Sequence, residues 1–225
     1  MAELPAFLNI KTPPSLKEIA FQAIKESILT HRLKPGAIYS EQAIAKELNI
    51  SKTPVHQALT DLEARGFVAV LPRKGFQVTV LKEKDIREMF EFRHALERAV
   101  IFHVTPELTD KSIKEIESLN GQAATTRDRI RFLKFDRGFH RYLTTLTQNE
   151  YIITALENIW DLCDWVGGEI FDLKNRPGEA VREHVAIAEM LKKRNVGGAA
   201  EAMKEHLRIT EMRFHQLMSK DRGTP

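Results

Sequence analysis

Cysteine is almost absent from this sequence of 225 residues, where Cys163 is the only one. A single thiol cannot form a disulfide within the chain, so we expect a reducing compartment, the cytoplasm. Long apolar runs are also missing, because no stretch reaches the roughly 20 residues that span a bilayer. Met1–Ile10 lacks the basic start and the apolar run of a signal peptide. We therefore expect no membrane partner.

A large charge imbalance is missing as well, since 34 Lys and Arg face 31 Asp and Glu. The small surplus is unevenly distributed. Residues 1–80 hold ten basic and seven acidic side chains, whereas residues 81–225 hold twenty-four of each. A domain that faces phosphates needs positive charge, so this distribution supports nucleic-acid contact by the N-terminal part without establishing it.

The segment Ser40–Val80 predicts two helices with a turn between them, followed by a hairpin. Ser40 is a suitable N-cap for the first helix, because its hydroxyl accepts from a free backbone N–H. Ser51 or Thr53 caps the second helix, in whose first turn Pro54 is tolerated. Helical spacing gives this second helix a buried stripe made of Val55, Ala58, Leu59 and Leu62.

The hairpin and the front of the second helix carry polar groups suited to DNA. Two predicted strands, Phe67–Leu71 and Phe76–Val80, enclose a basic turn whose glycine permits a positive φ. The outward groups suited to phosphates and base edges are Lys52, Thr53, His56 and Gln57 on the helix and Arg73, Lys74 and Gly75 at the turn. This layout predicts a winged helix-turn-helix domain over residues 15–80, with its second helix in the major groove. The alternative is a small helical cap domain with an unrelated hairpin.

Two stretches of this domain resemble the DNA-binding domain of the GntR family of bacterial transcription regulators. They are SKTPVHQAL at residues 51–59 and PRKGFQV at residues 72–78. The family usually has Arg where this chain has Lys52 and His56, and often Glu where it has Gln57. Lys52 lacks the bidentate fork of Arg, and His56 is mostly neutral at neutral pH. The resemblance therefore implies the fold and DNA binding, and it leaves the operator sequence open.

Beyond a short linker at residues 81–84, only helical patterns occur. We expect residues 85–220 to form an all-α domain of six helices, and residues 1–14 to form a loose arm. The resemblance to the GntR family implies that this all-α domain binds an effector and dimerises. After a first helix at 16–33, the helices of the bundle are predicted at 85–103, 109–121, 126–147, 151–172, 178–194 and 198–218. The predicted fold class is mostly α, with an N-terminal winged helix-turn-helix, a small β-hairpin wing and a C-terminal helical bundle.

Four side chains of the predicted bundle have the types and spacing of a metal site. Asp136 and His140 lie four residues apart on or beside an apolar stripe, so they point the same way. His184 and His206 lie on the apolar faces of two later helices. Buried carboxylates and imidazoles are costly unless satisfied, and one divalent cation would satisfy all four. Three nitrogens and one oxygen suit zinc, nickel, manganese or iron. The alternative is that each His is an ordinary core residue.

Three segments resemble the signature segments of the FCD domain, the helical effector domain of the FadR-like branch of the GntR family. They are FDRGFHRYL at residues 135–143, EHVAIAEML at 183–191 and AAEAMKEHL at 199–207. Many members of that branch bind a metal through an Asp, a His four residues on, and one His from each of two later helices. The resemblance thus implies Asp136, His140, His184 and His206 as ligands, with zinc favoured. The lack of a long insertion resembles the six-helix subgroup.

The resemblance also implies a small carboxylate effector. In similar proteins the metal keeps open positions for a carboxylate, and an Arg on the first helix of the domain helps hold it. EFRHALE at residues 91–97 resembles that segment, so Arg93 is the candidate. An i,i+4 ion pair between Arg93 and Glu97 is an equally weighted alternative. Nearby side chains that we interpret as core or dimer contacts are Tyr142, Asn158, Trp160 and Trp165.

The leading hypothesis is a homodimeric transcription regulator, not an enzyme, that binds a pseudo-palindromic operator in double-stranded DNA. A carboxylate at the metal would shift the population of the DNA-competent dimer, and family precedent favours repression relieved by the effector. A second hypothesis is a metal-dependent enzyme acting on a small carboxylic acid, for which the chain shows no well-marked general base. A third is a bundle that only dimerises and binds no ligand.

Overall fold

The computed structural model describes residues 13–167 and 176–221. Contacts divide the chain into two compact units, residues 1–80 and 81–225, and each unit is described by itself. Most of the predicted N-terminal arm lies outside the described residues, as does the predicted end of one helix at Asp172. No helix in the described part is both long enough and apolar enough to cross a membrane.

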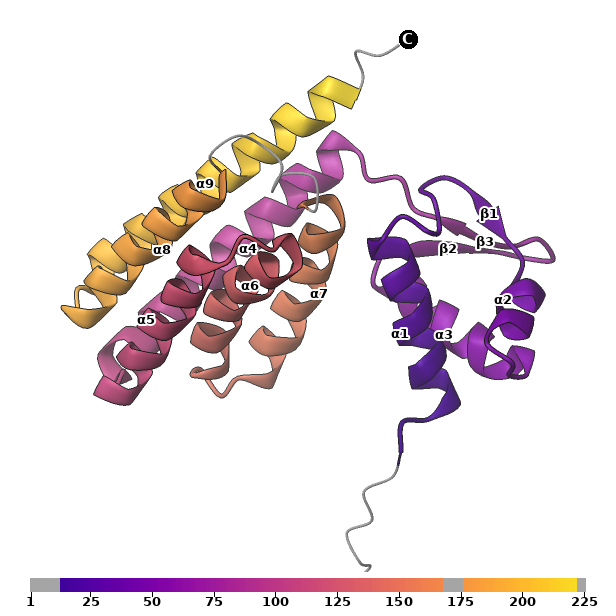
Figure 1. The fold of residues 1–225 in the computed structure, drawn as a ribbon, viewed down its shortest axis with the longest axis horizontal. Coiled ribbons are helices and arrows are strands. Elements are labelled where there is room, and N and C mark those ends of the chain that lie inside the picture. Colours follow the sequence, from indigo (N-terminus) through magenta and orange to yellow (C-terminus); the bar gives the residue numbers. More distant parts are fainter. Residues whose placement is uncertain (1–12, 168–175, 222–225) are drawn as a thin grey trace, which may run out of the picture. The chain divides into compact units, whose positions relative to one another are not determined.

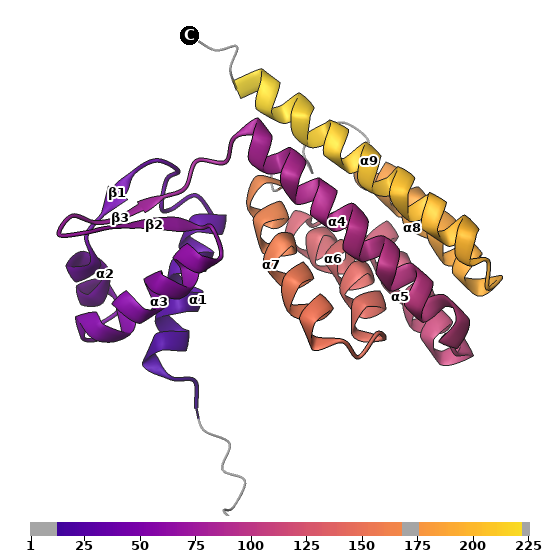
Figure 2. The same cartoon turned by 180° about the vertical axis from the view of Figure 1, so that it is seen from behind.

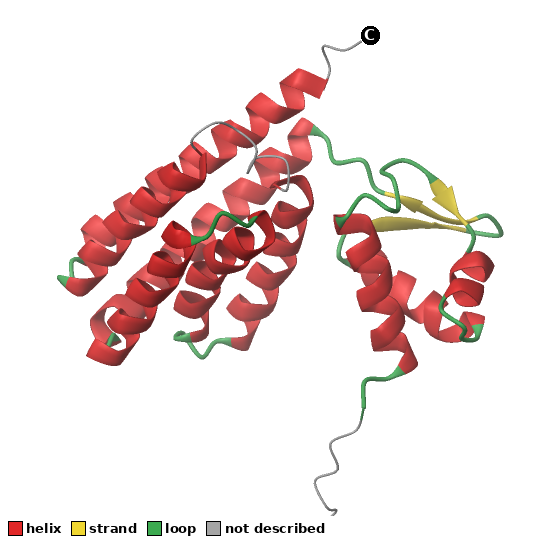
Figure 3. Cartoon of the chain, viewed as in Figure 1, coloured by secondary structure: helices red, strands yellow, loops and turns green. Residues whose placement is uncertain are grey.

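The first unit combines three helices with a small antiparallel sheet (Figures 1 and 3). Its elements are α1 (Leu16–Leu29), β1 (Ile38–Tyr39), α2 (Glu41–Glu47), α3 (Lys52–Ala64), β2 (Val68–Leu71) and β3 (Gly75–Val78). The strand order is β1-β3-β2, and β2 pairs with β3 in the predicted hairpin. The strand β1 was not predicted, because two residues carry no alternating pattern. It adds to β3 through Ile38 opposite Gln77 and Tyr39 opposite Phe76.

Side-chain caps define where the helices of the first unit begin. Ser15 forms a capping box with Glu18 at the start of α1. Ser40 caps α2 as predicted, because its side chain accepts from the backbone N–H of Ala43. Ser51 has the N-cap position of α3 but makes no side-chain cap hydrogen bond. The predicted first helix was four residues too long, since α1 ends at Leu29 and His31 has a φ of 55°.

The wing turn between β2 and β3 rests on one glycine. Gly75 has a φ of +115°, and a Cβ at this position would collide with the carbonyl oxygen of Tyr39. Only glycine meets both conditions. The turn also holds Arg73 at a φ of 65° and a hydrogen bond from the N–H of Lys74 to the carbonyl of Leu71, at 3.0 Å. Gly75 thus sets how closely the basic turn approaches the start of α2.

The second unit is a bundle of six α-helices within the described residues (Figure 2). They are α4 (Glu83–Val104), α5 (Asp110–Thr125), α6 (Arg129–Thr145), α7 (Glu150–Gly167), α8 (Arg176–Lys192) and α9 (Val196–Asp221), with a 3-10 turn at Thr105–Glu107. The helix α4 begins inside the predicted linker. Pro177 lies in the first turn of α8, where it breaks no hydrogen bond, so α8 begins two residues before its predicted start.

The main apolar core of the second unit lies between α4, α5, α6, α7, α8 and α9. The helix α9 packs along both α4 and α8, as Figures 1 and 2 show from opposite sides. Fully buried core side chains include Ile101, Ile116, Phe139 and Leu191. Each stabilises the fold by roughly 1.5–3 kcal/mol through loss of apolar contact with water. This core surrounds a small group of buried polar side chains.

Candidate metal centre and nucleic-acid interface

Three imidazoles from three helices meet inside the second unit. His140 comes from α6, His184 from α8 and His206 from α9, and each is at most 3% exposed. One ring nitrogen from each lies within 4.8 Å of the others, a spacing that suits a single metal ion. The periodicity of each helix placed its His on the buried face, and the packing of α8 and α9 brings the faces together.

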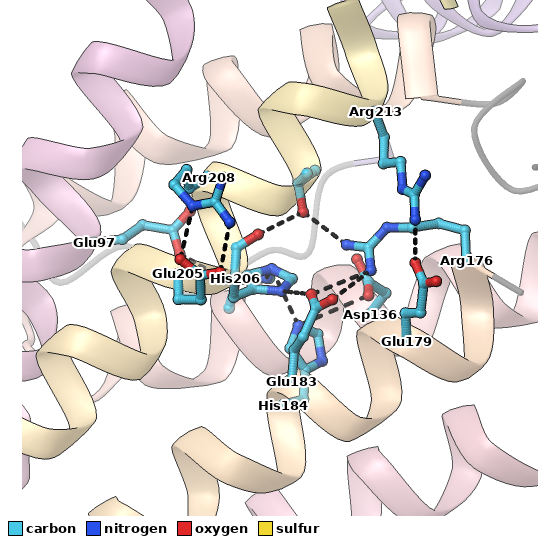
Figure 4. Close-up of polar contacts among 12 residues, drawn as sticks. Glu97, Asp136, Arg176, Glu179, Glu183, His184, Glu205, His206, Arg208 and Arg213 are labelled. Carbon is cyan, nitrogen blue, oxygen red and sulfur yellow. Dashed lines mark hydrogen bonds and ion pairs between the residues drawn. The ribbon is translucent and has the colours of Figure 1, made fainter. Parts of the chain in front are cut away.

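The fourth predicted ligand lies beside this cluster. The Oδ1 atom of Asp136 is 3.8 Å from the Nε2 atom of His184, and the Asp136 side chain is half-buried (Figure 4). Burial raises the pKa of Asp136, although the His140 side chain and nearby arginines oppose the rise. All four side chains that the sequence predicted as ligands are therefore in one place, and their role as metal ligands stays a prediction.

An Arg–Glu pair holds His140 from behind. The Nδ1 atom of His140 lies 2.6 Å from Oε2 of Glu97, and Arg93 contacts the other oxygen of Glu97 at 2.7 and 2.8 Å. The indole N–H of Trp160 donates to the same carboxylate at 3.2 Å. Burial alone would raise the pKa of Glu97, but Arg93 and His140 hold it far below its ordinary value. Glu97 is therefore ionised and fixes the ring of His140.

A second Arg–Glu pair holds His206 in the same manner, as Figure 4 shows. The Nδ1 atom of His206 lies 2.7 Å from Oε2 of Glu183. Arg176 donates to both oxygens of Glu183, at 3.0 and 3.1 Å, and to the hydroxyl of Thr210 at 2.7 Å. Burial raises the pKa of Glu183, and the contact with Arg176 opposes that rise. The same arrangement thus occurs twice: an Arg holds a Glu, and the Glu fixes the orientation of a histidine ring. The two sets are Arg93–Glu97–His140 and Arg176–Glu183–His206.

His184 is held by packing. Its ring stacks on Phe139 with ring centres 4.1 Å apart and planes 11° from parallel. Burial lowers the pKa of both His184 and His206 well below the ordinary value, and the neighbouring imidazoles add to that effect. Both rings are therefore neutral at neutral pH, which is the state that binds a metal.

The site fits a divalent cation because the Nε2 atoms of its histidines face one another and can be unprotonated. A carboxylate only accepts hydrogen bonds, so Glu97 and Glu183 place the protons of His140 and His206 on Nδ1. The two Nε2 atoms of these rings, in their neutral forms, are then bare lone pairs 3.2 Å apart. Nε2 of His184 lies 3.4 Å from that of His206. Nitrogens bound to one tetrahedral zinc at about 2.0–2.1 Å are about 3.3 Å apart, so the separations fit the ion.

A cavity of about 80 Å³ opens beside the imidazoles. Its lining includes Arg93, Asp136, His140, Arg176, His206 and Thr210, together with apolar side chains such as Trp160. Arg93 is only 4% exposed and forms the ion pair with Glu97 that the sequence offered as the alternative. Its Nη1 atom donates to Cys163 at 3.6 Å. The structure thus shows the ion pair, and effector binding by Arg93 stays a prediction.

The predicted DNA-contacting side chains form one exposed face of the first unit. Lys52, Thr53, His56 and Gln57 are all exposed on the first two turns of α3. A depression of about 530 Å³ separates that end of α3 from the wing, and Arg73, Lys74 and Gly75 line its other side. The helix and the turn therefore face a common space, as DNA contact by both requires. Their contacts with DNA stay predictions.

The sequence pattern did not single out Glu41, Glu183 or Arg176. Glu41 lies buried beneath the front of α3, and Glu183, Arg176 and Trp160 surround the imidazoles. Glu183 precedes His184 by one position, so helical periodicity places it on another face, and its partner His206 lies on the next helix. A contact between two helices, such as that of Glu183 with His206, leaves no pattern in the sequence of either helix. Trp160, interpreted from the sequence as core or a dimer contact, both packs in the core and donates to Glu97.

Comparison with known proteins gives two family matches. Residues 16–78 match the family described as bacterial regulatory proteins, gntR family. Residues 88–209, more than half of the chain, match the FCD domain. The matches cover most of each unit.

Individual relatives agree with these matches. The HTH-type transcriptional repressor RspR of Escherichia coli (strain K12) is 26% identical over 213 residues, which cover 93% of this chain and 93% of that protein. The HTH-type transcriptional regulator YdhC of Bacillus subtilis (strain 168) is 26% identical over 191 residues, or 83% of this chain and 84% of that protein. Among solved structures, E. coli McbR/YncC has a TM-score of 0.76 at 20% identity, covering 91% of this chain and 99% of that one, which is a likeness of fold.

Proposed function

The chain belongs to the GntR family of bacterial regulatory proteins and carries an FCD domain, and on this premise we propose that it represses its target genes until a small carboxylate binds at a metal centre in its second unit. Membership confirms the predicted fold class and the predicted DNA-binding transcription regulator. It favours a regulator over the hypothesis of a metal-dependent enzyme. Repression is proposed because the relative RspR is named a transcriptional repressor.

One observation carries the metal proposal. Two buried imidazoles, those of His140 and His206, turn their Nε2 atoms toward each other at 3.2 Å, while their Nδ1 atoms contact Glu97 and Glu183. Facing lone pairs in a buried site repel, and a divalent cation between them replaces the repulsion by two bonds. His140, His184, His206 and Asp136 would hold the cation. Zinc is the first candidate, since three imidazoles and one carboxylate suit it, with nickel, manganese or iron as alternatives.

The cavity beside the imidazoles supports a small acid as the effector. A bound divalent cation supplies a Lewis-acidic centre with positions open to a carboxylate. Arg93 faces the same cavity, and its guanidinium is held rigidly by Glu97. Arg176 lines the other side, anchored by Glu183 and Thr210. A volume of about 80 Å³ restricts the ligand to few heavy atoms unless neighbouring segments move.

An exposed apolar stripe supports the homodimer. Phe92, Ala95, Ala99 and Phe102 follow one another at intervals of three and four residues on the solvent side of α4, with Phe92 43% and Phe102 48% exposed. This is the spacing of a seam between two helices. A second copy of the chain would cover this stripe. The dimer would present two α3 helices to a pseudo-palindromic operator. We place it in the bacterial cytoplasm, where the DNA is. Analytical ultracentrifugation of Ala99→Glu tests this seam, because a buried charge there should weaken the dimer. An unchanged dimerisation affinity would mean that the interface lies on another surface.

Elemental analysis of the purified protein is the deciding experiment for the metal. We expect about one transition-metal ion per chain, after loading with zinc and removal of the excess. His140→Ala should lose it, whereas His103→Ala, on the exposed end of α4, should keep it. Full occupancy in His140→Ala would remove His140 from the ligand set. No metal in the wild-type protein would end the metal proposal and leave the family membership intact.

The effector proposal needs DNA binding as its readout. Zinc-loaded protein is bound to DNA enriched from a random-sequence duplex library, and small mono- and dicarboxylates are added singly. We expect at least one of them to weaken DNA binding, and the same acid to have no effect on His140→Ala. If all the acids act equally with and without metal, the carboxylate does not act through this centre. If an acid strengthens DNA binding, the proposal that the effector releases the repressor from its operator is wrong.

A further inference from the structure

An acidic side chain lies buried on the side of the first unit that faces DNA. Glu41, the first residue of α2, has a side chain only 9% exposed. It lies in the depression between the front of α3 and the wing turn, together with Ser40 and Gln42 of its own segment. A carboxylate here would repel phosphates unless it were neutralised. Neighbouring side chains must therefore compensate the negative charge of Glu41.

Two side chains of α3 contact Glu41, and the ammonium group of Lys52 offsets its negative charge. Its Oε1 atom lies 3.0 Å from Nδ1 of His56, and its Oε2 atom lies 3.2 Å from Nζ of Lys52. Burial raises the pKa of Glu41, but the hydrogen bonds from His56 and Lys52 outweigh this and lower it below the ordinary value. Glu41 is thus a carboxylate at neutral pH. It holds at once two of the groups predicted to contact DNA.

The contact with Glu41 decides which hydrogen bond His56 offers to DNA. A carboxylate only accepts, so the Nδ1 atom of His56 must carry a proton. In the neutral ring Nε2 is then an acceptor. The His56 side chain is 56% exposed, and Nε2 has no partner among the described residues. In its neutral form, His56 therefore presents an acceptor at the front of α3.

We propose that Glu41 is a positioning residue that determines base preference: by fixing the Nδ1–H tautomer of His56, it makes Nε2 accept a hydrogen bond from an exocyclic amino group in the major groove. Only two bases present such a donor there, adenine at N6 and cytosine at N4. Guanine presents two acceptors on its edge and is disfavoured opposite this atom. The inference rests on the predicted contact of His56 with DNA, and it adds the base that this contact selects.

Replacing Glu41 by Gln removes the constraint on the His56 tautomer at nearly constant shape. A Gln amide donates as well as accepts, so Nδ1 can become the acceptor and Nε2 the donor. The donor form of His56 matches the N7 and O6 atoms of guanine. His56→Gln is the matched comparison, because a Gln at position 56 donates and accepts without help from position 41.

The test selects binding sites with the full-length chain from a random-sequence DNA duplex library. We expect wild-type protein to prefer adenine or cytosine at one base pair of each half-site, and Glu41→Gln to shift that preference toward guanine by about tenfold. In the His56→Gln background, the same change at position 41 should leave the preference unaltered. Identical enriched sites for wild type and Glu41→Gln, both folded by circular dichroism, would overturn the proposal.

A second measurement does not depend on any variant at position 41. Protonated and unprotonated ring nitrogens differ in their ¹⁵N chemical shifts, so NMR of histidine-labelled protein at pH 7.5 reports the tautomer. The His56 signals are those missing from the spectrum of His56→Gln. The expected pattern is protonated Nδ1 with unprotonated Nε2. An Nε2–H tautomer or a doubly protonated ring at this pH overturns the proposal, because either one removes the acceptor. A DNA preference at this position that persists in His56→Ala would instead refute the contact on which the inference rests.

Discussion

The Nδ1 atom of His140 lies 2.6 Å from Oε2 of Glu97, and both side chains are only 3% exposed. This contact fixes the ring so that its other nitrogen faces His206. We expect Glu97→Gln to lower the affinity for zinc about 10–100-fold, because the neutral amide neither fixes the tautomer nor raises the basicity of the ring. Competition against a chromophoric chelator measures the affinity.

Glu205→Gln is the matched control for this variant. Glu205 lies on α9 next to His206 but forms an exposed pair with Arg208 at 2.7 Å, outside the cavity lining. Its loss should leave the zinc affinity unchanged. Glu97→Gln also leaves the buried Arg93 without its ion pair, so thermal unfolding must show that the variant is folded. Equal affinities in folded Glu97→Gln and wild type would show that Glu97 does not support a metal ligand.

The sequence predicted those parts of the fold that repeat within one helix. The stripe of Val55, Ala58, Leu59 and Leu62 is buried as expected, and Gly75 adopts the positive φ that its turn position suggested. Positions that depend on contacts between distant segments were not predictable from periodicity. The strand β1 forms only because β3 offers it an edge, and its two residues have no pattern of their own.

The same distinction holds for the candidate metal site: positions within one helix were predictable, and contacts between helices were not. Spacing places Asp136 and His140 on one face, and periodicity places His184 and His206 on the apolar faces of two later helices, but only the packing of these helices brings the side chains together. The supporting carboxylates were missed for two different reasons. The sequence offered Glu97 only as the i,i+4 partner of Arg93 in one of two alternatives, while the structure turns its second oxygen to His140 from another helix. Glu183 lies on another face of its helix than His184, and its partner His206 comes from the next helix.

Gly75→Ala should destabilise the wing more than Gly66→Ala. Both glycines have a positive φ, of +115° and +81°, but a Cβ collides with the carbonyl oxygen of Tyr39 only at position 75. We expect about 1 kcal/mol for Gly66→Ala and about 3 kcal/mol for Gly75→Ala. Hydrogen exchange of the amides in β2 and β3 gives both values. Equal losses would mean that the wing can move away from Tyr39 at little cost.

Lys74→Ala should weaken DNA binding and make it less dependent on salt. Lys74 is exposed at the tip of the wing, where a phosphate contact releases one counterion. The slope of log K against log salt concentration should fall in magnitude by about 1. Lys111→Ala, an exposed change on α5, should leave the slope unchanged. A slope in Lys74→Ala equal to that of the wild type would argue against contact between the wing and the DNA backbone.

The stability of the metal-free second unit should depend on pH through its buried histidines. Burial lowers the pKa of His184 and His206 in the folded protein, whereas both take up a proton near pH 6.5 once unfolded. The unfolded state then binds more protons below pH 6.5, so stability is lost as the pH falls below that value, by up to about 1.4 kcal/mol per pH unit for each ring. Asp164 acts in the opposite sense. Burial raises its pKa to about 6, so the folded state gains a proton there.

A difference measurement removes the contribution of Asp164. Both tryptophans, Trp160 and Trp165, lie on α7, so tryptophan fluorescence during urea unfolding reports the second unit alone. With chelator present, the stability difference between wild type and His184→Gln should be smaller at pH 5.5 than at pH 7.5 by about 1 kcal/mol, because the wild type alone carries the penalty of a neutral buried His184. His103→Gln, on the exposed end of α4, should give a constant difference. A constant difference for His184→Gln as well would mean that His184 takes up its proton equally in the folded and unfolded states, and the imidazoles would then not be held neutral by their burial.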